Sequence, residues 1–125
     1  MNTDATVRNY KDLLVWQEGI ALVKHVYVLT RSFPADERFG LVTQMRRAAV
    51  SVPSNIAEGQ ARRTTGEFKH FLAIAQGSLA ELDTQLILST HLGFATEGGI
   101  QEISALVTKL QRMLHALQSK LPATN

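Results

Sequence analysis

Hydrophobic residues recur along this chain at intervals of three and four positions, which is the spacing of one face of a helix. Turn signals divide the pattern into four segments, at about 10–32, 34–59, 64–93 and 97–120. The connections between them are short, which favours antiparallel neighbours. The sequence therefore predicts an all-α fold, an antiparallel up-down-up-down four-helix bundle. We expect a single domain over residues 1–125, with flexible ends at about 1–9 and 121–125.

Helix-end signals support these boundaries. Thr64 is followed three positions later by Glu67, which is the pattern of a capping box at the start of the third helix. Gly93 suits the left-handed position just after the end of that helix. Pro34, with acidic residues at 36 and 37, predicts that the second helix begins near residue 34.

The second segment contains Pro53 in its middle. Apolar residues keep the same helical phase on both sides of it, through Met45, Ala48, Val52 and Ile56. Because a true break usually loses phase, we predict one long helix that is bent at Pro53.

The first segment has two adjacent apolar sides, which together span about 200° of the helix, whereas a helix facing one core needs roughly 100°. One side holds Leu13, Trp16, Ile20, Val23 and Tyr27. Either this helix is central in the bundle, or its second side meets another copy of the chain. We assign that predicted interface to the adjacent side, at Val15, Leu22, Val26 and Leu29.

The second and third helices also carry polar stripes. In an antiparallel hairpin that turns near residues 62–64, the numbers of facing residues add to about 128. Arg47 then faces Glu81, and Ser51 faces Ser78. This register predicts a polar layer made of Arg47, Ser51, Asn55, Glu58, Ser78 and Glu81. A solvated surface stripe is the alternative, whereas a buried layer would fix the register of the two helices.

Composition narrows the class of protein. The chain has 125 residues, of which 45% are hydrophobic and 19% are charged, and this composition favours a folded core over disorder. The absence of cysteine excludes disulfides and zinc–cysteine sites. No signal-like start or membrane-length apolar run occurs, so we expect a cytoplasmic protein without membrane contact.

Charge is unevenly distributed although the net charge is only +2. Residues 38–70 carry six cations and two carboxylates, while residues 71–108 carry four carboxylates and no cation. Mutual neutralisation across the bundle is the favoured explanation, and a basic face is the alternative. A basic face would offer Arg46, Arg62, Arg63 and Lys69 to a nucleic-acid backbone. Phe68 and Phe71 belong to the core stripe, so they predict no platform for stacking bases.

Motifs for catalysis are missing. Glu67 and His70 form the Glu-x-x-His unit of di-iron bundles, but no second copy of the unit exists. The surroundings of Ser78 lack the flanking glycines of a nucleophile elbow, and there is no phosphate-binding loop. We therefore predict no enzyme activity, no cofactor, no metal and no small-molecule substrate.

Two stretches, "YKDLLVWQEGIALV" and the block containing "RRAAVSVPSNIAEG", closely resemble the four-helix proteins encoded by intervening sequences in bacterial large-subunit ribosomal RNA genes. The resemblance covers residues 10 to about 90. It implies a left-handed up-down bundle that assembles as a ring, commonly a pentamer. A more distant relative is the accessory protein of diversity-generating retroelements, which binds its reverse transcriptase and nucleic acid.

Two functional hypotheses follow. The first is a non-enzymatic oligomeric scaffold that associates with RNA or a ribonucleoprotein, which the basic residues favour. The second is a protein-interaction module without a nucleic-acid role, which the modest net charge of +2 favours.

Overall fold

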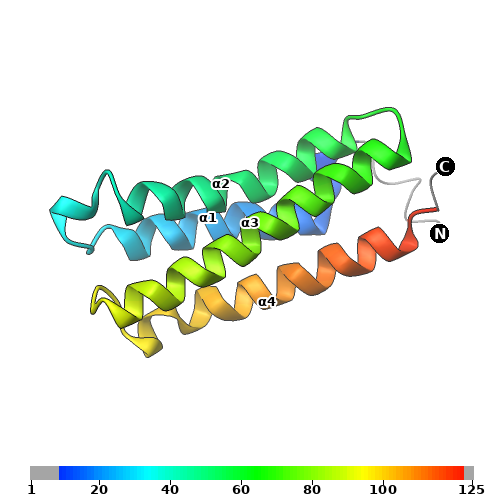
Figure 1. The fold of residues 1–125 in the computed structure, drawn as a ribbon. Coiled ribbons are helices and arrows are strands. Elements are labelled where there is room, and N and C mark those ends of the chain that lie inside the picture. The colour runs from blue at the N-terminus through cyan, green and yellow to red at the C-terminus, as the bar shows by residue number, and fades with distance from the viewer. Residues whose placement is uncertain (1–8, 123–125) are drawn as a thin grey trace.

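A computed structural model describes residues 9–122 of the chain. Four α-helices run through this part: α1 (Leu14–Thr30), α2 (Leu41–Gln60), α3 (Thr65–His91) and α4 (Glu97–Lys120) (Figure 1). Short 3-10 turns precede the first two, namely η2 (Tyr10–Asp12) and η3 (Ala35–Glu37). Of the predicted flexible ends, 1–9 and 121–125, residues 1–8 and 123–125 lie outside the described part of the chain.

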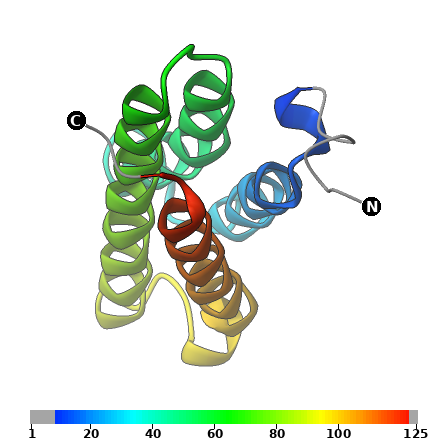
Figure 2. The ribbon, with the colours of Figure 1, turned by 90° about the vertical axis from the view of Figure 1, so that its right-hand side faces the viewer.

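The helices pack as antiparallel neighbours in chain order. The α2–α3 turn lies at the same end of the molecule as the start of α1 and the end of α4, while the other two connections lie at the opposite end (Figure 1). Viewed along its length, the molecule shows α1 and α3 each placed between α2 and α4 (Figure 2). This arrangement confirms the predicted all-α four-helix fold.

Each helix contributes an apolar stripe to one continuous core. The largest fully buried side chains come from all four helices: Leu22, Val26, Met45, Val52, Ile56, Leu72, Leu79, Leu82, Leu86, Val107, Leu110 and Leu114. Burial of this apolar surface supplies most of the driving force for the fold.

Helix α2 passes through Pro53 as one continuous element, as the unbroken apolar phase predicted. Met45, Ala48, Val52, Pro53 and Ile56 are all buried. Its predicted start was wrong, however, because α2 begins at Leu41 and not near Pro34. Residues 35–37 form η3 instead, and the Glu37 carboxylate accepts a hydrogen bond of 3.2 Å from the Leu41 N–H. The acid therefore caps α2 from the preceding turn.

The first helix is also shorter than predicted. Leu13 is extended and separates η2 from α1, and α1 ends at Thr30. The Asn9 side chain accepts from the Lys11 N–H at 2.8 Å, which holds η2 as a separate turn.

The ends of α3 agree with the sequence signals. The Thr64 hydroxyl accepts from the Glu67 N–H at 3.1 Å and so caps the first turn. Gly93 has φ 78°, and the Phe94 N–H donates to the Ser89 carbonyl at 2.9 Å. This is a Schellman ending, which satisfies carbonyl groups that the helix leaves free.

Candidate functional site

The centre of the predicted polar layer joins α2 to α3. The hydroxyls of Ser51 and Ser78 share a hydrogen bond of 2.8 Å, which confirms the predicted register of the two helices. The Asn55 side-chain amide donates to the Ser51 hydroxyl and to the Ser51 carbonyl, each at 2.8 Å. Ser78 is 8% exposed. The contact therefore fixes how α2 and α3 align.

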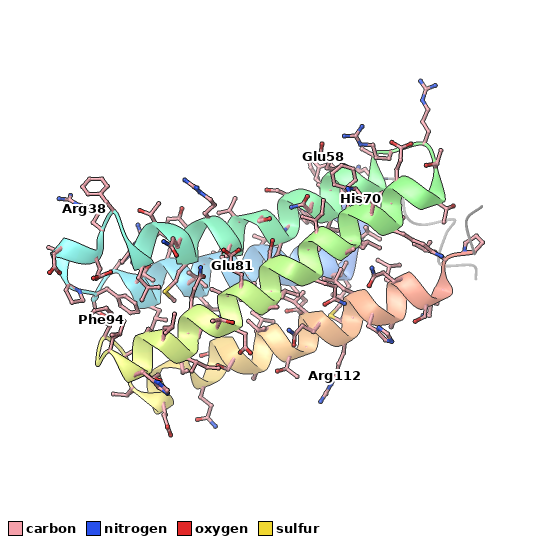
Figure 3. The ribbon with its side chains drawn as sticks, in the orientation of Figure 1. Arg38, Glu58, His70, Glu81, Phe94 and Arg112 are labelled. Atoms are coloured by element: carbon pink, nitrogen blue, oxygen red, sulfur yellow. The ribbon has the colours of Figure 1, made fainter. Side chains whose placement is uncertain are left out.

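The charged residues of the predicted polar layer do not take part in this hydrogen-bonded contact. Arg47, Glu58 and Glu81 are exposed, and Figure 3 shows Glu58 near the α2–α3 turn and Glu81 midway along α3. Within residues 9–122, no ion pair joins Arg47 to Glu81. At Arg47 and Glu81 the structure therefore agrees with the alternative, a solvated surface stripe, because both side chains are exposed.

Arg46 differs from its predicted role as a free contact for a polyanion. It is half-buried, and its Nε donates to the Thr30 hydroxyl at 2.9 Å. Its guanidinium lies over the Tyr27 ring, 4.4 Å from the ring centre. The prediction placed Arg47 in the contact between helices and Arg46 on the surface. In the structure Arg46 links α2 to α1, and Arg47 is exposed.

The other predicted contacts, Arg62, Arg63 and Lys69, lie at the α2–α3 turn, and we call them the basic turn. Arg62 pairs with Glu58 at 2.8 Å and lies 3.9 Å from Glu67. It also covers the Phe71 ring at 4.9 Å. Arg63 is exposed and Lys69 is half-buried. Two carboxylates thus offset part of the positive charge at this end.

The residues of α1 predicted to form an interface between copies belong to the core of the single chain. Val15, Leu22 and Val26 are 4%, 0% and 0% exposed, so they belong to the core, and Leu29 is half-buried against it. The side that remains accessible contains Trp16, Ile20 and Val23.

This accessible side forms an apolar groove between α1 and α2. Its volume is about 490 Å³. The lining residues come from η2, α1 and α2: Tyr10, Trp16, Ile20, Val23, Lys24, Val50, Pro53, Ser54 and Ala57. The width of the apolar arc on α1 was the signal for this surface, but arc width alone does not say which side faces the core.

The two α3 residues of the Glu-x-x-His unit, Glu67 and His70, have different neighbours. Glu67 is engaged by Thr64 and Arg62, and the His70 ring lies edge-on to Phe71 at 5.5 Å. Across residues 9–122, no three histidine or carboxylate side chains gather where they could hold a metal ion. No helix in the same range combines the length and apolar character needed to cross a membrane.

Comparison with known proteins agrees with the four-helix arrangement. A solved structure from Bacteroides thetaiotaomicron is similar to this chain, with a TM-score of 0.78 and 20% identity over 86% of this chain and 100% of the other. That protein is described as having unknown function and as coming from the S23 ribosomal protein family. No curated protein matches the chain. The model of the 23S rRNA-intervening sequence protein family matches residues 11–116, and the chain belongs to that family.

Proposed function

We propose that the protein is a non-enzymatic scaffold that assembles with further copies of itself and associates with RNA or a ribonucleoprotein. The observation that carries the assembly is the apolar groove between α1 and α2. Trp16, Ile20 and Val23 stay half-buried in a single chain, and Val50 is 40% exposed beside them. A second hollow of about 460 Å³ shares Val23 and Lys24 with this groove. A continuous apolar surface of this kind marks a protein contact.

The assembly we propose is a ring, most simply a pentamer, of left-handed bundles in which α2 bends at Pro53. Light scattering should then give a mass about five times the 13.8 kDa of one chain. Val50→Glu should shift this mass to that of a monomer, because a carboxylate would have to be buried in the groove. Thr108→Glu adds the same charge on the exposed side of α4 and is the matched control. A monomeric wild-type protein would contradict the ring.

RNA association rests on the basic turn and on the family description, which names an intervening sequence of 23S rRNA. A ring would present Arg63 and Lys69 several times around its circumference and so add multivalency. Replacing Arg62, Arg63 and Lys69 by Gln should weaken RNA retention and flatten its salt dependence. Arg112→Gln is the control, because Arg112 points away from the bundle on α4 (Figure 3).

A protein-interaction module without an RNA role is the second candidate. Arg62 is engaged by Glu58 and Glu67, and the net charge of the chain is only +2. Unmodified protein that retains no RNA at low salt would favour this candidate.

A further inference from the structure

The connection between α1 and α2 brings three arginines around one cavity. Arg31, Arg38 and Arg46 line a cavity of about 400 Å³, together with Thr30, Pro34 and apolar side chains. No lining residue carries a carboxylate. Figure 3 shows Arg38 at the end of the bundle opposite to Glu58 and His70, so this cavity is far from the basic turn.

One of the three guanidinium groups is held in place from two directions. Arg46 donates from Nε to the Thr30 hydroxyl at 2.9 Å and stacks on Tyr27 at 4.4 Å. Thr30 is 3% exposed, and its own hydroxyl donates to the Val26 carbonyl at 2.8 Å. The two terminal nitrogens of Arg46 are not used in these bonds. A planar donor fork that is already oriented binds an oxyanion with little further loss of rotamer freedom.

The surrounding charges leave this cavity positive. Within residues 9–122, Arg31, Arg38 and Arg46 form no ion pair. Of the two nearby acids, Glu37 is bonded to the Leu41 N–H, and Asp36 does not line the cavity. Val42, in the first turn of α2, does line it, so the positive end of that helix adds to the field.

An aromatic ring stands exposed beside Arg38, one of these three arginines. Phe39 is 87% exposed, more than any other large hydrophobic side chain in the described part of the chain. The Arg38 guanidinium lies 5.3 Å from the centre of its ring. Proteins that hold single strands combine such a ring, on which a base stacks, with cations that hold the backbone.

We propose that the α1–α2 connection is a binding site for single-stranded nucleic acid. A backbone phosphate occupies the arginine cavity and contacts Arg46, while Arg31 and Arg38 supply further charge. The adjacent base stacks on Phe39. This site is separate from the basic turn and does not depend on it. It gives the protein a preference for unpaired bases that cations on a helix surface do not supply.

The test is binding of a labelled single strand of about ten nucleotides and of a duplex of the same length. Phe39→Ala should weaken single-strand binding roughly five- to hundredfold and leave duplex binding unchanged. Arg46→Gln should weaken both and lower the salt slope by about one. Leu92→Ala is the control for Phe39→Ala, because Leu92 is 57% exposed and lies at the same end of the bundle.

A spectroscopic variant separates stacking from an effect on folding. Phe39→Trp keeps an aromatic ring, so it should retain affinity, and its added fluorescence should be quenched by the single strand but not by inorganic phosphate. The native Trp16 lies in the α1–α2 groove and provides the unquenched reference.

Three results for Phe39→Ala would overturn the site. The variant could bind the single strand with wild-type affinity, or it could lose as much affinity for the duplex as for the single strand. A change in its oligomer mass would instead make Phe39 a protein contact. These results are distinct from failure of the basic turn. If Arg62, Arg63 and Lys69 are replaced by Gln and single-strand binding persists until Phe39 is also removed, the site at the α1–α2 connection stands alone.

Discussion

The two sides of α2 are packed very differently. Toward α3, α2 meets its neighbour with fully buried side chains, and Gly59 lies so close to α3 that an added Cβ would be 2.7 Å from the Phe71 Cβ. Toward α1, a surface groove of about 490 Å³ remains. There an added Cβ on Gly19 would be 3.2 Å from the Pro53 Cβ, which is a less severe contact.

The difference shows that apolar stripes at helical spacing can serve either packing within one chain or contact with a second molecule. The α2–α3 contact is complete within one chain and is fixed by the Ser51–Ser78 bond. The helix α1 is joined to α4 partly by accessible polar contacts, such as Lys109 with Glu18 at 2.9 Å. Its groove-facing side chains would gain most by burial against a second molecule. Mutations should therefore act on folding at the first contact and on assembly at the second.

The largest expected difference comes from truncating matched isoleucines. Ile56 is 0% exposed, so Ile56→Ala should cost about 2–5 kcal/mol of unfolding free energy through lost burial and a cavity. Ile20→Ala removes a half-buried side chain of the groove, so its cost in a single chain should be about 1 kcal/mol. Denaturant titration checks both values. Equal costs in a monomeric preparation would contradict the comparison.

A pair of glycines tests how closely the helices approach. Gly59→Ala should destabilise by about 1–3 kcal/mol, because Phe68 and Phe71 leave no room for a methyl group. Gly77, on the exposed side of α3, has nothing within 4 Å of an added Cβ. Gly77→Ala should therefore stabilise by roughly 0.5–1 kcal/mol through helix propensity alone. Melting curves of the two variants should shift in opposite directions.

Much of the fold was predictable because local signals and packing agree. The caps at Thr64 and Gly93 and the continuity of α2 through Pro53 depend on a few neighbouring residues. The Ser51–Ser78 register followed from the short α2–α3 turn. The start of α2 was missed because the acids at 36 and 37 belong to η3, from which one of them caps the helix.

The candidate sites were harder to predict because they depend on where α1 lies. Arg46 and Arg47 are about 100° apart on α2, and the sequence does not say which of them meets Tyr27 and Thr30. The same uncertainty placed Val15, Leu22 and Val26 at an interface although they are in the core. Phe39 gave no periodic signal because it lies in a connection between helices.

The serine pair should show coupling of intermediate size. Ser51→Ala leaves the hydroxyl of Ser78, which is 8% exposed, without its bond, so we expect a cost of about 1–2 kcal/mol. In the double variant Ser51→Ala/Ser78→Ala, neither hydroxyl is left unpaired. Its cost should be smaller than the sum of the single costs by about 0.5 kcal/mol or more. Strict additivity would show that the bond does not hold the register.

The smallest effect is expected at Glu81. The predicted register pairs Arg47 with Glu81 as it pairs Ser51 with Ser78, but both charged side chains are exposed. Exposed charge pairs contribute at most about 1 kcal/mol, because water and salt screen them. Ala is also the better helix former, which offsets part of any loss. Glu81→Ala should therefore change the unfolding free energy by less than about 1 kcal/mol, as should Arg47→Ala, and the two effects should add. A loss of about 3 kcal/mol or more for Glu81→Ala would mean that Arg47 is buried and left without compensation, which would extend the specific α2–α3 contact to its charged edge.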